Sequence, residues 1–159
     1  MIIQVLVAVI STLAFAVLFH VPRQEYLYCA INGGLGWVVY KLCLYYGFGG
    51  VVSCLWATLT LTLVARILSA LRKMPSTVFL LAGIFTLVPG SGVYYTAYYL
   101  IMNELSRSTA KGIETFKIAG AIVFGIIFGL ALPQSWFNRL GRLTDRKKPS
   151  AAKKPCGKA

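Results

Sequence analysis

The sequence predicts an all-α integral membrane protein: a five-span helical bundle with a broken fourth helix and a basic C-terminal tail. Of its 159 residues, 58% are hydrophobic and only 13% are charged, and the mean hydropathy is +0.74. A soluble domain has about a quarter of its residues charged, and a disordered chain has low hydrophobicity. The net charge of +12 would suit a nucleic-acid-binding protein, but the apolar content would not. A soluble enzyme and a nucleic-acid partner are therefore not expected.

Five apolar stretches reach or approach the roughly 20 residues that a bilayer-spanning helix needs. They cover residues 2–19, 26–46, 48–71, 77–102 and 113–132. The first is interpreted as a span rather than a cleaved signal peptide, because no basic residue precedes its apolar run. Residues 1–135 are thus predicted to form a five-helix transmembrane domain. Residues 136–159 are predicted to form a basic cytoplasmic tail without ordered structure.

The basic tail also predicts the orientation of the chain. Its lysines and arginines make one side of the membrane far more basic than the other, which favours a cytoplasmic C-terminus and an external N-terminus in a bacterial cytoplasmic (inner/plasma) membrane. Without the tail the two sides are balanced. Anionic lipid is the expected partner of the tail. Its basic residues are Arg139, Arg142, Arg146, Lys147, Lys148, Lys153, Lys154 and Lys158.

The fourth stretch contains the best candidate for a binding site. Proline and flanking glycines at positions 89–92 should interrupt the helix near mid-bilayer, leaving half-helices at about 77–88 and 93–104. Ser91 is the predicted N-cap of the second half, whose free N–H groups suit a substrate carboxylate. Four tyrosines follow within six positions. The alternative is that the proline only kinks the helix and the tyrosines lie at the membrane interface.

Two polar residues in other spans join this candidate site. Arg66 lies on one face of the third span with Thr58 and Thr62, which could be a polar pathway wall with Arg66 opposing a carboxylate, or ordinary interhelical bonding. Asn32 could equally line a site or join helices. The predicted substrate-binding residues are Pro89, Gly90, Ser91, Gly92, Tyr94, Tyr95, Tyr98, Asn32 and Arg66.

Small residues four apart predict close helix packing in the second and fifth spans. The clearest stripe is Ala121, Gly125 and Gly129 in the fifth span, and Gly33 and Gly36 belong to the second. A ligand role for these residues is the less favoured reading.

Catalytic and metal chemistry are not predicted. The four cysteines form no C-x-x-C pair, His20 is the only histidine, and no nucleophile–base pair or paired carboxylates lie at a plausible depth. We therefore expect no cofactor, no metal site and no enzymatic activity.

Two segments resemble the threonine/serine exporter family. Residues 79–96, with Pro89-Gly90 followed by Tyr94 and Tyr95, are similar to its P-G-x-x-x-Y segment. Residues 19–23 and 29–37 resemble the first loop and second span of its small, YjjB-like subunits. These correspond to the C-terminal membrane half of fused exporters.

The resemblance implies a subunit of a secondary exporter of small carboxylate-bearing solutes: threonine and serine in some members, succinate in others. It also implies a larger membrane subunit as partner, which would form an inverted repeat with this half and allow alternating access. A homo-oligomer is a further partner prediction. The alternative function is a non-transporting scaffold that stabilises or orients a partner transporter.

Overall fold

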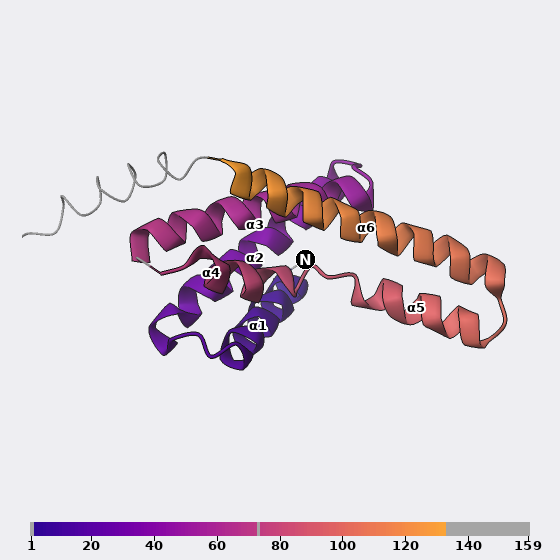
Figure 1. Cartoon of the computed structure of the whole chain (residues 1–159), viewed down its shortest axis with the longest axis horizontal. Helices are drawn as coiled ribbons and strands as arrows, with labels where there is room; N and C mark the ends of the chain where they lie inside the picture. Colours follow the sequence, from indigo (N-terminus) through magenta and orange to yellow (C-terminus); the bar gives the residue numbers. More distant parts are fainter. Residues whose placement is uncertain (1, 73, 133–159) are drawn as a thin grey trace, which may run out of the picture.

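The computed structural model describes residues 2–72 and 74–132, and the regular elements of these residues are all helical (Figure 1). A short 3-10 turn, η1 (Arg23–Glu25), precedes the second helix. The α-helices are α1 (Ile2–Leu18), α2 (Tyr26–Tyr45), α3 (Gly50–Arg72), α4 (Ser76–Ile84), α5 (Gly90–Ile101) and α6 (Leu105–Ala131). The all-α prediction is confirmed for this part of the chain. The predicted basic tail, 136–159, lies outside the described residues.

Within residues 2–72 and 74–132, three helices are long and apolar enough to cross a membrane: residues Arg23–Tyr45, which include α2, then α3 and α6. They match the second, third and fifth predicted spans. The first predicted span corresponds to α1, whose apolar part, Ile3–Leu18, is shorter. The fifth differs at its start, because α6 begins at Leu105 rather than near Ile113.

The predicted fourth span with its broken helix is not confirmed. Its place is taken by α4, of 9 residues, and α5, of 12 residues, each too short to cross the roughly 30 Å hydrocarbon core alone. Helix α4 ends at Ile84 and α5 begins at Gly90, so the gap opens earlier than predicted and α5 begins earlier. The two helices do not contact each other. A count of five spans therefore stays a prediction.

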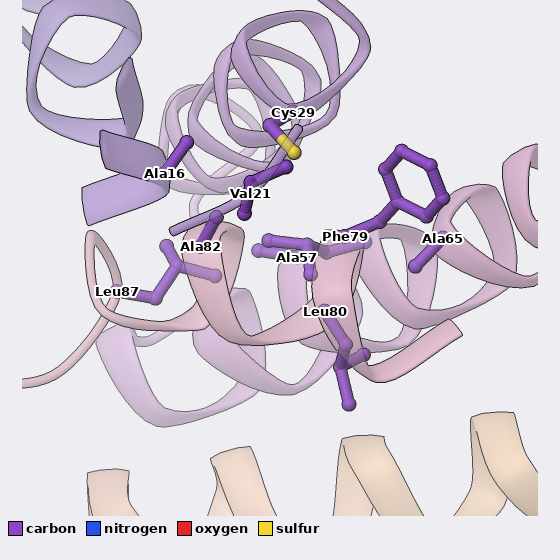
Figure 2. Packing of buried hydrophobic residues seen from close by; sticks show 10 residues of the cluster. Ala16, Val21, Cys29, Ala57, Ala65, Phe79, Leu80, Ala82 and Leu87 are labelled. Carbon is purple, nitrogen blue, oxygen red and sulfur yellow. The ribbon is translucent and has the colours of Figure 1, made fainter. Parts of the chain in front are cut away.

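Helices α1 to α4 pack together around a core of mostly small residues (Figure 2). Leu61 of α3 is fully buried and lies against two glycines. A Cβ added at Gly36 of α2 would be 3.0 Å from the Leu61 side chain, and one added at Gly83 of α4 would be 2.9 Å from it. Phe79 is the largest fully buried side chain. The glycines thus let three helices approach one leucine, as the small-residue pattern in the second span predicted.

An ion pair joins the first loop to the end of α3. The guanidinium of Arg72 donates from Nη2 to Oε1 of Glu25 (2.7 Å) and from Nε to both carboxylate oxygens (2.9 and 3.0 Å). The ring of Tyr28 lies under the same guanidinium, 4.7 Å from its carbon. The first loop and the end of α3 therefore lie at the same end of the bundle.

Helix α6 packs on α3 through the predicted small-residue stripe. A Cβ at Gly125 would be 2.9 Å from Cβ of Thr58 and 3.1 Å from the carbonyl oxygen of Leu55. At Gly129 it would be 2.5 Å from Cγ2 of Thr62. The packing role predicted for these glycines is confirmed.

Helix α5 stands apart from the other described helices and contacts only α6. Figure 1 shows α5 and the adjoining part of α6 extending to the right, away from α1 to α4. No residue of α5 is buried. The predicted site residues of α5 thus lie on a projecting hairpin of helices, not inside the bundle.

Candidate functional site

The non-helical segment of residues 85–89 joins the bundle to α5. Its Leu87 is buried in the bundle core, which fixes one end of the segment. At the other end the N–H of Gly90 donates to the carbonyl of Val88 (2.8 Å). Pro89 lacks an N–H group and clashes with a preceding helical turn, so the helix of α4 cannot continue through it.

The first turn of α5 differs from the prediction in one respect. Helix α5 begins at Gly90 with Pro89 as its N-cap residue, and no side chain caps it. Ser91 therefore lies within the first turn, and its predicted N-cap role is wrong. The physical reason is that Pro89, with φ −77°, already has a dihedral compatible with helix entry. The N–H groups of Ser91 and Gly92 point out of the positive end of the helix.

Four tyrosines cover the outward side of α5. Tyr94 stacks on Tyr98 and Tyr95 stacks on Tyr99, each pair with ring centroids 6.3 Å apart. Edge contacts between Tyr94 and Tyr95 and between Tyr98 and Tyr99 join the two pairs. Tyr94, Tyr95 and Tyr98 remain 63%, 47% and 42% exposed. The helical spacing of the tyrosines thus produces one aromatic surface, and the rest of the described chain does not cover it.

The inner side of α5 forms a groove with α6. Its volume is about 450 Å³ and its lining is almost entirely apolar. A hydrogen bond from Oγ of Ser108 in α6 to the carbonyl of Thr96 in α5 (2.8 Å) also joins the two helices. Sequence reasoning missed this groove, although small residues four apart, at Gly92 and Thr96, were a signal of it. Its lining residues are Val93, Thr96, Ala97, Leu100, Gly112, Thr115, Phe116 and Ala119.

Asn32 lies at the contact of α2 with α4. It is fully buried, and its Nδ2 donates to the carbonyl of Phe79 (3.1 Å) while Oδ1 has no hydrogen-bond partner. The amide thus ties α2 to α4 at a residue five positions before the end of α4. Of the two readings of Asn32, this geometry supports a link between helices.

The side chain of Arg66, a residue of α3, reaches the C-terminal end of α6. Its Nη1 donates to the carbonyls of Gly129 (2.9 Å) and Leu130 (2.8 Å), and the residue is only 5% exposed. The last carbonyls of a helix have no partners within the helix and carry its negative dipole end, so a cation there is favourable. Thr58 and Thr62 on the same face bond to carbonyls of their own helix. This face packs on α6, where Thr58 and Thr62 lie against Gly125 and Gly129.

The structure does not bring all the predicted residues together. Helix α5 has no contact with α2 or α3, so neither Asn32 nor Arg66 is brought against α5. The candidate site consists of the gap, the first turn of α5 and its tyrosines. Among the described residues, no cluster of three His, Cys, Asp or Glu side chains could hold a metal ion.

Apolar helices of spanning length and a wholly helical architecture define a polytopic α-helical membrane protein. The sequence matches the family described as "Threonine/Serine exporter, ThrE" over residues 4–132, and the chain belongs to this family. The resemblance seen in the sequence is thereby confirmed.

One curated relative is a protein of Haemophilus influenzae (strain ATCC 51907 / DSM 11121 / KW20 / Rd) described as uncharacterized. It is 30% identical over 140 residues, covering 86% of this chain and 47% of that protein. The chain therefore spans about half the length of the curated relative it matches. No solved structure matches the chain.

Proposed function

We propose that this chain is one subunit of a secondary exporter of small carboxylate-bearing solutes and that it acts with a larger membrane subunit. The observation that supports it most is the gap at residues 85–89, followed by the exposed positive end of α5, in a chain of the threonine/serine exporter family. Secondary transporters hold substrate carboxylates at the ends of such discontinuous helices.

In this proposal the substrate carboxylate binds at the N-terminal end of α5. The N–H groups of Ser91 and Gly92 and the hydroxyl of Ser91 would donate to its oxygens. Tyr94, Tyr95 and Tyr98 would line the cavity, where a ring face can hold the ammonium group of an amino acid. Succinate has no ammonium group, so the tyrosine rings favour threonine or serine.

A partner subunit is part of this proposal, because the described part of this chain leaves the candidate site uncovered. Tyr94, Tyr95 and Tyr98 are 42–63% exposed, and among the described helices α5 contacts only α6. Irregular backbone at membrane depth persists only where protein buries it or a watery cavity meets it. A second membrane half packed against α5 would satisfy this requirement and allow alternating access around the gap.

The direct test is efflux. Cells loaded with labelled threonine, serine or succinate would be compared with and without this chain together with its larger partner. We expect faster efflux of threonine or serine only when both chains are present. Unchanged efflux of all three solutes contradicts the proposal. The alternative, a scaffold without transport of its own, predicts that substitutions at Ser91 and the tyrosines are silent while bulky residues at Gly33, Gly36 or Gly125 abolish assembly.

A further inference from the structure

Helix α6 lies against different helices at glycines near its start and near its end. Toward its start, a Cβ at Gly112 would be 3.3 Å from Cγ2 of Thr96 in α5. Toward its end, a Cβ at Gly125 would be 2.9 Å from Cβ of Thr58 in α3. Gly120 lies between these two glycines.

Gly120 has no packing reason to be a glycine in the described chain. A Cβ at this position would meet nothing within 4 Å, whereas Gly112, Gly125 and Gly129 all have close neighbours. A glycine inside a helix costs about 1 kcal/mol relative to alanine. What it provides instead is backbone freedom. Gly90, at the start of α5, likewise has nothing within 4 Å.

These two glycines stand at the boundaries of one substructure. We call α5 and residues 105–119 of α6 the arm, and α1 to α4 with residues 121–131 the bundle. Between them the described chain crosses only twice, immediately before α5 and in the middle of α6. Gly90 lies at the first crossing and Gly120 at the second.

Each substructure is joined internally by specific contacts. Within the arm, Ser108 bonds to the carbonyl of Thr96, and a Cβ at Gly92 would clash with Oγ1 of Thr115. Within the bundle, Arg66 bonds to the end of α6, and the Glu25–Arg72 ion pair ties the first loop to α3. Helices α1 to α4 make no contact with α5. Flexibility is thus expected at the two crossings rather than within either part.

We propose that Gly90 and Gly120 are the two hinges about which the arm turns as a unit relative to the bundle. A hinge needs only a few residues that absorb changes in φ and ψ while the flanking parts stay rigid. The motion would change the position of the first turn of α5 relative to the core that holds Leu87. The hinge itself does not depend on the cargo, but its part in transport rests on the proposed function.

The hinge is tested by distances between spin labels on the full chain in lipid vesicles, with its four native cysteines replaced by alanine. One label would replace Ser106, which is exposed near the arm tip, and the other Tyr45, which is 82% exposed at the end of α2. Leu27 and Tyr45, both exposed on α2, give a rigid reference pair. We expect a broad or two-peaked distribution of distances between the labels at positions 106 and 45, which we call the arm distribution. The distances between the labels at positions 27 and 45 should have a narrow distribution. Equally narrow distributions for both pairs would overturn the proposal.

Alanine substitutions then identify the hinges. Gly90→Ala and Gly120→Ala fit without a clash, since no atom lies within 4 Å of either Cβ position. Together they should narrow the arm distribution and slow efflux. Gly49→Ala is the matched control, because Gly49 is equally open but lies in the loop before α3. An unchanged arm distribution in the double variant would overturn the assignment of these hinges, whatever the chain transports.

A relocated glycine separates flexibility from any special property of position 120. The variant Ala119→Gly/Gly120→Ala keeps one glycine between the two packed parts of α6. Gly120→Ala alone should narrow the Ser106–Tyr45 distance distribution in part, and we expect the relocated glycine to restore its breadth. Failure of this rescue contradicts a hinge in α6, and because the readout is a distance, a chain that shows no efflux still gives an answer.

Discussion

Arg72 and Glu25 form a bidentate ion pair that connects the last residue of α3 to the loop before α2, with a closest approach of 2.7 Å between Nη2 and Oε1. The two partners differ in exposure: 7% of the Glu25 side chain is accessible, against 34% for Arg72. Glu25 is also the N-cap residue of α2, where the positive end of the helix favours a carboxylate. The pair holds α3 and α2 together at the turn that leads into α4.

This asymmetry predicts that the two halves of the pair are not equivalent. Arg72→Gln leaves a buried carboxylate without its partner, whereas Glu25→Gln leaves an arginine that water can reach. Removing one partner of a buried pair is costly mainly through the group left behind. We expect Arg72→Gln to lower the thermal unfolding temperature in detergent more than Glu25→Gln does. The double variant should be more stable than Arg72→Gln alone, and equal losses in the two single variants would contradict this account.

The contact of α6 with α3 predicts a strong effect at Gly125. A methyl group there meets the carbonyl oxygen of Leu55 at 3.1 Å and the N of Leu59 at 3.2 Å, and backbone atoms cannot move aside as a flexible side chain can. Gly125→Ala should therefore destabilise the fold by roughly 1–3 kcal/mol, the usual cost of overpacking. Abundance in the membrane and thermal stability in detergent measure it. Gly120→Ala, on the same helix but in open space, is the matched control and should keep normal abundance.

Much of the fold could be predicted, because the length of an apolar run indicates a helix and the spacing of small residues indicates which face of it packs closely. The stripe ending in Gly125 and Gly129 identified the contact of α6 before any partner helix was known. Proline at position 89 likewise marked the start of α5 at Gly90, although α4 already ends at Ile84. These features depend on a few neighbouring residues, which is why sequence reasoning reached them.

What could not be predicted depends on contacts between distant residues. Arg66 is a predicted counter-charge for substrate, and no spacing in the sequence indicated that its Nη1 donates to the carbonyls of Gly129 and Leu130, 63 and 64 positions away. The separation of α5 from α4 was also missed, because spacing along one helix does not reveal which other helices it touches. The role of the predicted site residues in binding substrate remains a prediction.

The position of Arg66 makes its role testable. If it serves to bind the last carbonyls of α6, Arg66→Leu should lower stability by about 1.5–3 kcal/mol, the value of a hydrogen bond to a charged group. Thermal stability and membrane abundance would fall together, and any loss of efflux would follow the abundance. A variant that keeps full abundance but needs more substrate for half-maximal efflux would instead support the counter-charge reading.

The substrate site is tested at two residues of α5 that have close counterparts elsewhere in the chain. Ser91→Ala removes a hydroxyl from the first turn of α5, and Tyr95→Phe removes one from a tyrosine that is 47% exposed. If these hydroxyls bind substrate, efflux of labelled threonine or serine should fall about five- to tenfold per variant, since a net hydrogen bond contributes roughly 1 kcal/mol and a charged acceptor strengthens it.

The matched controls are Ser106→Ala, in the first turn of α6, and Tyr46→Phe, on a tyrosine that is 71% exposed after α2. Both remove the same chemical group from an exposed position outside the candidate site, so both should keep efflux and abundance. Tyr95→Leu tests the ring face separately from the hydroxyl. It removes the ring face that would hold an ammonium group, so efflux of threonine should be slower in Tyr95→Leu than in Tyr95→Phe. Succinate has no ammonium group, so its efflux should be the same in the two variants. Full efflux in Ser91→Ala and in both Tyr95 variants, at normal abundance, would move the substrate site away from α5.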